Sequence, residues 1–115
     1  MLAREQSGGV VHIGDWIKLH RKLLYWEWYK DTKTKALFIH LLLKACYTDG
    51  KRSHGFTLKR GQIITTLPKL SDETGLSIQE IRTALAHLES NREITQRTTN
   101  KFRIITIEKW DFYQT

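Results

Sequence analysis

The sequence predicts an α+β fold in which three helices form the core and a β-hairpin follows the third helix. Three observations support this prediction. Gly75 separates two short amphipathic segments between residues 66 and 91. Ser77-Ile78-Gln79-Glu80 matches a capping box, in which a hydroxyl and a carboxylate satisfy N–H groups at a helix start. Two runs rich in β-branched residues, 94–99 and 102–107, then predict a pair of strands.

Residues 66–91 have the pattern of a helix-turn-helix. Pro68 suits the first turn of a helix, where the N–H that proline lacks is not needed. Gly75 suits the left-handed residue that ends such a helix. The second helix carries an apolar stripe at helical spacing, formed by Ile78, Ile81, Leu85 and Leu88. The same pattern occurs in DNA-binding domains and in helix corners without a nucleic-acid role.

The segment before the helix-turn-helix contributes a helix and a strand. Apolar residues cover a wide face of residues 35–47, which predicts a mostly buried helix with Cys46 in it as a small buried residue. Residues 49–55, DGKRSHG, predict a loop whose cations face solvent, and Ile63-Ile64-Thr65 predicts a short strand. A strand here and a hairpin at the end define a winged helix-turn-helix, with its wing at about 94–107.

Aromatic residues gather near both ends of the chain. Residues 15–30, DWIKLHRKLLYWEWYK, mix aromatic with basic side chains, and we expect them to pack rather than to stack on nucleic acid. The tail 108–114, EKWDFYQ, adds three more aromatic residues. Because residues 104–107 are apolar on both faces of their strand, we expect the tail and this aromatic extension to meet on the second face. We interpret residues 1–13 as a flexible leader and 14–115 as a single domain.

The composition narrows the classes of function. The 115 residues carry a formal net charge of +7, which favours polyanionic partners. The five histidines and the single cysteine lack metal-ligand spacing, and no phosphate-binding loop or nucleophile elbow occurs. The sequence therefore predicts no enzyme activity, no metal and no cofactor. No stretch is apolar enough to span a bilayer, so no membrane partner is expected, and one cysteine fits a reducing cytoplasm.

Residues of the second helix and of the wing are the candidate DNA contacts. With about 100° per residue, Thr83 points away from the apolar stripe. Gln79 flanks Thr83, and Arg82 lies at one border of this outward face. Gln79 can read adenine, Arg82 can read guanine or hold a phosphate, and Thr83 can meet a thymine methyl group. Ser77 and the N–H groups behind it can bind a phosphate. The wing offers four residues to the backbone or the minor groove: Arg97, Asn100, Lys101 and Arg103.

We do not expect the other polar residues of the same helix to contact DNA. His87 and Ser90 are interpreted as ordinary surface residues, and Glu80 as a cap rather than a recognition residue.

Several segments together resemble a family of phage and prophage replication proteins. They are DWIKLHRKLLYWEWYKD, KALFIHLLLKA, LKRGQIITT, KLSDETGLSIQEIRTALAHLES and TTNKFRIITIEKWDFYQ. The chain is similar over residues 14–114 to the winged-helix N-terminal domain of replisome-organiser and DnaD-like replication initiators. The helix-turn-helix is generic, whereas the W-I-K-L-H-R opening, the L-K-R-G-Q strand and the closing W-x-x-Y-Q are more specific.

The resemblance implies a role as well as a fold. Such proteins are often longer, with a second domain that contacts replisome components or single strands, whereas this chain ends at Thr115. Double-stranded DNA is the partner it implies here, with replisome proteins and self-association through the aromatic end segments as further expectations, in a bacterial or phage-encoded setting. Two other interpretations stay open: a small winged-helix transcriptional regulator, and an oligomerisation or protein-docking module that does not bind DNA.

Overall fold

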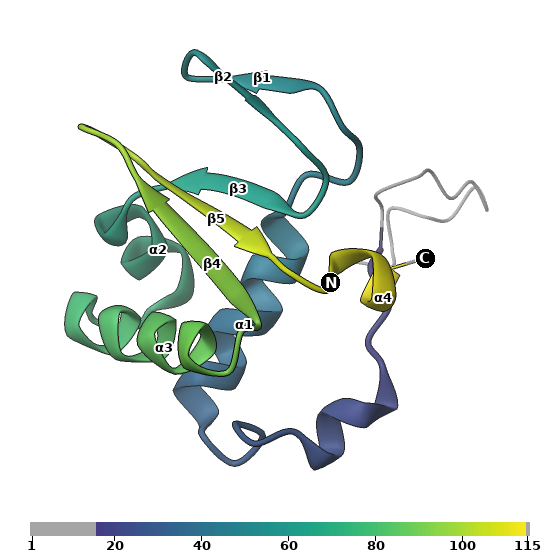
Figure 1. Cartoon of the computed structure of the whole chain (residues 1–115). Helices are drawn as coiled ribbons and strands as arrows, with labels where there is room; N and C mark the ends of the chain where they lie inside the picture. The colour runs from purple at the N-terminus through teal and green to yellow at the C-terminus, as the bar shows by residue number, and fades with distance from the viewer. Residues whose placement is uncertain (1–15, 115) are drawn as a thin grey trace, which may run out of the picture.

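The computed structural model describes residues 16–114, so the leader expected at residues 1–13 lies outside the described residues. The described chain is α+β (Figure 1). Its elements follow in the order η2 (Arg21–Tyr25, a 3-10 helix), α1 (Thr32–Lys44), β1 (Lys51–Ser53), β2 (Phe56–Leu58), β3 (Gln62–Thr65), α2 (Leu67–Thr74), α3 (Ile78–Ser90), β4 (Ile94–Thr98), β5 (Arg103–Ile107) and α4 (Trp110–Gln114).

The larger sheet has the antiparallel order β3-β5-β4, so β5 is its central strand. The two runs predicted as the terminal hairpin are confirmed as β4 and β5, and Ile94 pairs with Ile107 at the base of that hairpin. β3, predicted from Ile63-Ile64-Thr65, pairs with β5 in the register Ile63↔Ile105. Helices α1, α2 and α3 with this sheet form an arrangement compatible with a winged helix (Figure 1).

The first long helix begins and ends earlier than predicted. Asp31 caps α1, because its side chain accepts a 3.0 Å hydrogen bond from the Thr34 N–H. The helix ends at Lys44, so the expectation that Cys46 lies in a helix is wrong. Cys46 is half-buried and pairs its backbone with the start of β3, donating to the Gln62 carbonyl and accepting from the Gly61 N–H.

The helix-turn-helix forms through the local signals that predicted it. Gly75 follows α2 with a φ of +80°, a left-handed conformation that L side chains rarely adopt. At the start of α3 the Ser77 hydroxyl accepts from the Glu80 N–H at 3.1 Å, and the Ser77 N–H donates to the Glu80 carboxylate at 2.9 Å. The predicted capping box is therefore confirmed.

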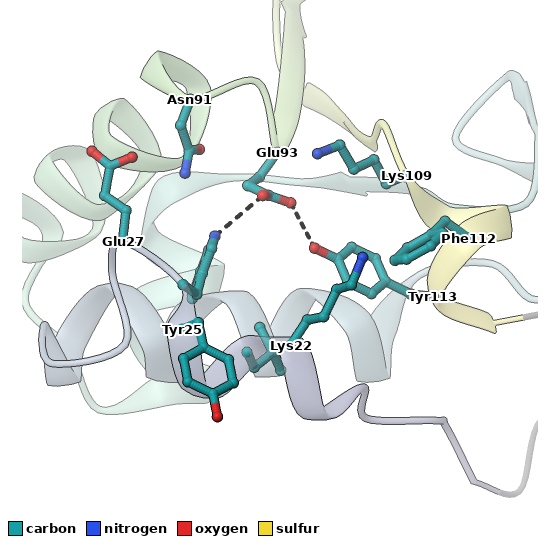
Figure 2. A pocket seen from close by; sticks show the side chains of 10 residues that line it. Lys22, Tyr25, Glu27, Asn91, Glu93, Lys109, Phe112 and Tyr113 are labelled. Atoms are coloured by element: carbon teal, nitrogen blue, oxygen red, sulfur yellow. Dashed lines mark hydrogen bonds between the residues drawn. The ribbon is translucent and has the colours of Figure 1, made fainter.

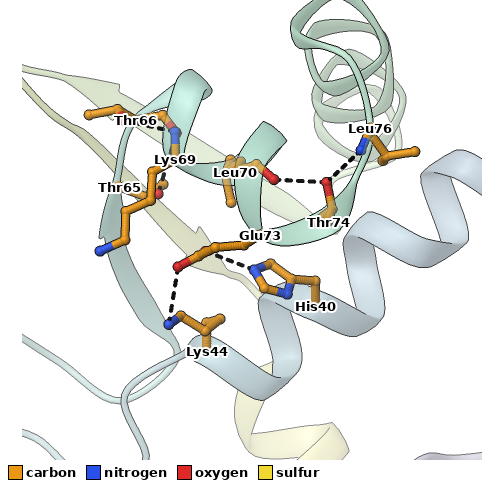
Figure 3. Close-up of polar contacts among 9 residues, drawn as sticks. All are labelled: His40, Lys44, Thr65, Thr66, Lys69, Leu70, Glu73, Thr74 and Leu76. Carbon is orange, nitrogen blue, oxygen red and sulfur yellow. Dashed lines mark hydrogen bonds and ion pairs between the residues drawn. The ribbon is translucent and has the colours of Figure 1, made fainter.

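Polar contacts hold α2 against α1 (Figure 3). The Glu73 carboxylate lies 3.0 Å from His40 Nε2 and 3.4 Å from Lys44 Nζ. Burial opposes the charge on Glu73, but the hydrogen bond from His40 and the charge of Lys44 outweigh it and lower the pKa of the carboxyl. Thr66 caps α2 by accepting from the Lys69 N–H. The charge of Glu73 on α2 is therefore engaged by His40 and Lys44 of α1.

The apolar stripe of α3 is confirmed at three of its four positions. Ile81, Leu85 and Leu88 are buried in the main core, where Ala84 joins them. Ile78 is 41% exposed, so its predicted burial is wrong. At about 100° per residue it lies at the border of the stripe that includes Ala84, and at the helix end few neighbours can cover it.

A second apolar cluster lies on the opposite face of the sheet from the helices. It joins Ile64 and Ile104, which are direct partners across β3 and β5, to Leu58 of β2. A β1–β2 hairpin, in which Arg52 pairs with Thr57, covers this face of the sheet. The prediction of a loop at residues 49–55 is therefore wrong for the part that forms β1. Phe56 and Leu58 alternate with Thr57, as expected of a strand with one apolar face.

The aromatic tail and N-terminal extension meet, but not on the second face of β5 as predicted. The Gln114 side chain bonds the Lys18 backbone in both directions, at 2.9 Å each. Phe38 of α1 contacts Trp26 from one segment and Tyr113 from the other, at ring-centroid distances of 4.8 and 5.8 Å. The hairpin already occupies the second face, so these segments extend the main core beside α1.

Replacement of Trp110 by alanine is expected to destabilise the fold by roughly 3–5 kcal/mol, the usual cost of emptying a buried aromatic site. Trp110 is only 5% exposed, and its Cβ would lie 2.7 Å from a Cβ built on Gly61, so the ring is closely packed. Urea denaturation followed by circular dichroism measures the change. Phe112→Ala is the control, because Phe112 is 53% exposed on the same short helix. Equal losses for the two variants would contradict the assignment of Trp110 to the core.

Candidate nucleic-acid interface

The exposed face of α3 carries the polar residues that were predicted to point away from the core. Gln79, Arg82 and Thr83 are all exposed, and Gln79 Nε2 lies 3.5 Å from Thr83 Oγ1, so these two share one side of the helix. Arg82 shares an edge with Glu89, because seven residues make almost two full turns. Within residues 16–114, Arg82 makes no ion pair, so its guanidinium is available to a ligand.

The start of α3 already holds an anion from the chain itself. Glu80 accepts the Ser77 N–H and also pairs with Lys33 of α1 at 2.5 Å. The hydrogen bond from Lys33, followed by that from the Ser77 backbone, lowers the pKa of the Glu80 carboxyl. Ser77 therefore serves as a helix cap, and the phosphate expected there would compete with the Glu80 carboxylate for the same N–H.

The two arginines of the wing point to opposite faces of the hairpin. The register pairs Arg97 with Ile104 and Thr98 with Arg103, and neighbouring residues of a strand alternate between faces. Arg97 is exposed on the face away from the helices, whereas Arg103 is half-buried on the helix side. Asn100 and Lys101 are exposed at the turn, which the Thr99 N–H closes by donating to the Phe102 carbonyl at 2.7 Å.

A chain of hydrogen bonds connects the wing to α3. Arg103 Nη1 donates to Gln96 Oε1 at 2.6 Å, and Gln96 Nε2 donates to Glu89 Oε1 at 3.2 Å. Arg103 was predicted as a simple contact to the DNA backbone. The structure places it between the wing and α3, where its guanidinium is hydrogen-bonded within the chain.

The tip of the wing faces the beginning of α2. A cleft of about 190 Å³ separates them, lined by residues 66–68 on one side and 98–103 on the other. Lys69 is exposed in the first turn of α2, one residue beyond this lining. Sequence reasoning missed Lys69, because a single lysine in a helix carries no signal of its own until the neighbouring wing is known.

The β1–β2 hairpin adds exposed basic side chains to the surface, and its turn contacts the tip of the wing. The His54 ring, in the turn of this hairpin, lies 4.4 Å from the Phe102 ring. Lys51 and Arg52 are exposed on β1, and Arg52 Nη1 donates to Thr57 Oγ1 at 2.7 Å. The sequence indicated a solvent-facing loop here, whereas the structure pairs β1 with β2 in a hairpin on the side of β3 away from the helices (Figure 1).

His87 is not the ordinary surface residue that was predicted. Its Nδ1 lies 2.9 Å from Thr34 Oγ1 and 3.2 Å from Asp31 Oδ2, and its ring stacks on Trp28 with centroids 4.1 Å apart. The Thr34 N–H, and to a smaller degree the charge of His87, lower the pKa of the Asp31 carboxyl. His87 therefore anchors the N-terminal extension and the start of α1 to α3.

The described residues contain neither a metal-binding cluster nor a membrane-spanning helix. Across residues 16–114 no three His, Cys, Asp or Glu side chains lie close enough to share a metal ion. No helix in this range is sufficiently long and apolar to cross a bilayer. Comparisons of the chain with protein-family models, curated proteins and solved structures give no match. The functional interpretation therefore depends on the surface formed by α3, the wing and the start of α2.

Substitution of His87 by alanine is expected to lower the free energy of unfolding by about 1–3 kcal/mol, because it removes a hydrogen-bond partner of the buried Thr34 hydroxyl. Ser90→Ala is the matched control on the same helix. The Ser90 hydroxyl is exposed and donates only to the His87 carbonyl of its own helix, so its loss should stay within about 0.5 kcal/mol. Urea midpoints at constant pH compare the two variants, and the anchoring role is refuted by coinciding midpoints.

Proposed function

We propose that this chain is a winged-helix module that binds double-stranded DNA, with α3 as the recognition helix and the β4–β5 hairpin as the wing. One observation carries the proposal. Arg82, Arg97 and Lys101 project from α3 and the wing without an ion pair inside residues 16–114, whereas Glu80 and Glu89 on α3 are each engaged by other side chains. The surface therefore presents cations whose charge is not already compensated.

Uncompensated cations on an exposed surface favour phosphates for a physical reason. Each Lys or Arg that contacts a phosphate releases condensed counterions, and this supplies most of the sequence-independent affinity for DNA. Lys101 lines the cleft between the wing and α2, Lys69 lies one residue beyond its lining, and Arg97 is exposed on the other face of the wing. We assign these residues to the DNA backbone.

Base reading is assigned to the exposed face of α3. The first half of a recognition helix reaches base edges in the major groove, and Gln79, Arg82 and Thr83 lie in that half of Ile78–Ser90. Their side chains offer an amide, a guanidinium and a methyl group, the chemistry that distinguishes bases there. Ala86, also exposed, adds no bulk between them.

The resemblance to phage-type replication initiators supports a role in DNA replication. Its three more specific motifs converge around α4: Gly61 of L-K-R-G-Q packs on Trp110, and the Lys18 backbone bonds Gln114. These motifs therefore describe a shared scaffold rather than the DNA contacts. Helicase or single-strand-binding-protein genes beside the gene for this chain would support replication over transcriptional regulation.

The affinity for duplex DNA is expected to fall by about a hundredfold or more between low and physiological salt. Each phosphate contact releases condensed counterions, and this release is less favourable when the salt concentration is high. Fluorescence anisotropy on random and genomic duplexes measures this dependence. An absence of binding even at low salt would refute the proposal and favour the protein-docking interpretation.

Substitutions in α3 and in the wing are expected to have different effects. Arg82→Ala or Thr83→Ala should narrow the gap between a selected site and scrambled DNA by roughly 1–3 kcal/mol, because a base contact is lost. Arg97→Ala or Lys101→Ala should weaken all duplexes alike and lower the salt slope by about one per lost phosphate contact.

The control for this comparison is Lys59→Ala, which removes an equal charge from the exposed bend before β3. Affinity is measured against salt for all variants on both DNA molecules. If the wing variants lose discrimination while the helix variants lose only overall affinity, the roles of the two elements are reversed.

A further inference from the structure

The N-terminal extension and α4 expose an unusual amount of apolar surface. Of the eight large apolar residues that are markedly exposed among residues 16–114, five belong to these two segments: Trp16, Leu19, Leu24, Tyr25 and Phe112. Tyr25 is 88% exposed. Scattered apolar residues are normal on protein surfaces, but a concentration of this kind marks an interaction surface.

A cavity of about 920 Å³ lies between these two segments (Figure 2). Leu23 and Trp26 from the extension and Phe112 and Tyr113 from α4 form its apolar walls. Its dimensions suit a large apolar side chain with the backbone that carries it.

The polar atoms within the cavity wall are already satisfied. Glu93 is only 5% exposed and accepts hydrogen bonds from Trp26 Nε1 at 3.1 Å and from the Tyr113 hydroxyl at 3.0 Å. Burial, and then the negative charge of Glu93, raise the pKa of Tyr113, so its hydroxyl stays a donor. A ligand group that enters must therefore be apolar, because these wall donors are occupied.

Two lysines lie among the residues that line the cavity. Lys22 and Lys109 line it, and the Lys22 amino group lies 5.3 Å from the Phe112 ring centroid. Nearby carboxylates are engaged elsewhere: Asp111 pairs with Arg60 at 3.1 Å, and Glu108 accepts from Thr95. Glu27 lines the cavity away from the two lysines in Figure 2.

From this geometry we propose that the cavity between the N-terminal extension and α4 binds an acidic peptide segment of a partner protein, with one large apolar side chain inserted and its carboxylates on Lys22 and Lys109. This site is separate from the proposed DNA interface and does not depend on it. A peptide places apolar and anionic groups within a few residues of each other, which matches an apolar cavity with a basic rim.

Two other occupants fit the observations less well. A second copy of this chain would bring the same lysines against each other, and like charges across an interface are costly. A single-stranded nucleic acid needs open ring faces for stacking. His20 stacks on Phe112 at 5.4 Å and the Lys22 amino group lies 5.3 Å from the same ring, so Phe112 already has stacking partners within the chain and the exposed Tyr25 is left as a single platform.

The test uses the whole chain and a short fluorescein-labelled peptide with one central phenylalanine among aspartates. Fluorescence anisotropy measures affinity, and the NMR signal of the Trp26 indole N–H reports occupancy of the cavity. Binding is expected to fall by about tenfold or more when the peptide phenylalanine becomes alanine, or when the protein carries Phe112→Ala or Lys22→Glu. A peptide with lysines in place of aspartates should not bind.

Arg97→Ala and Lys101→Ala are the matched controls and should leave peptide affinity unchanged, which separates this site from the DNA interface. The proposal is overturned if the peptide does not bind, or if the alanine peptide binds equally well, since charge alone would then suffice. It is also overturned if Phe112→Ala abolishes self-association in analytical ultracentrifugation or abolishes binding of a labelled oligothymidylate instead.

Discussion

The architecture depends on a central strand that is buried on both faces. Ile105 and Ile107 of β5 face the helices, whereas Ile104 faces the opposite way. An antiparallel sheet commonly leaves one face to water, but here that face is apolar and must be covered. The β1–β2 hairpin supplies the cover, and its turn brings His54 against Phe102 at the tip of the wing. A requirement of the core thus adds a hairpin with the exposed Lys51 and Arg52 to the surface.

A buried carboxylate organises the other side of the molecule. Glu93 follows α3 directly and accepts hydrogen bonds from Trp26 of the N-terminal extension and from Tyr113 of the tail. An uncompensated buried polar group would be costly, so the two donors and the acceptor depend on one another. Through this residue the N-terminal extension, at Trp26, and the tail, at Tyr113, are joined to the segment that follows α3, and the cavity between them has walls that suit apolar groups.

The distribution of charge follows a common rule on the two proposed surfaces. Glu80 is paired with Lys33 and Asp111 with Arg60, whereas Arg82, Arg97 and Lys101 are exposed and make no ion pair within residues 16–114. A net positive chain can in this way attract polyanions without losing the ion pairs and caps of its own helices. Arg103 is a cation of the wing that is hydrogen-bonded within the chain, because it donates to Gln96, which in turn donates to Glu89 of α3.

Features whose partners lie a few residues away could be predicted from the sequence alone. Gly75 marks the end of α2 and the Ser77 capping box marks the start of α3, because turns and caps are local interactions. The wing strands follow from the strand preference of their β-branched residues. The exposure of Gln79, Arg82 and Thr83 followed from helical periodicity in the same way. The contacts of His87, Arg103 and the 51–58 hairpin could not be predicted in this way, because they depend on separate segments of the chain that the fold brings together.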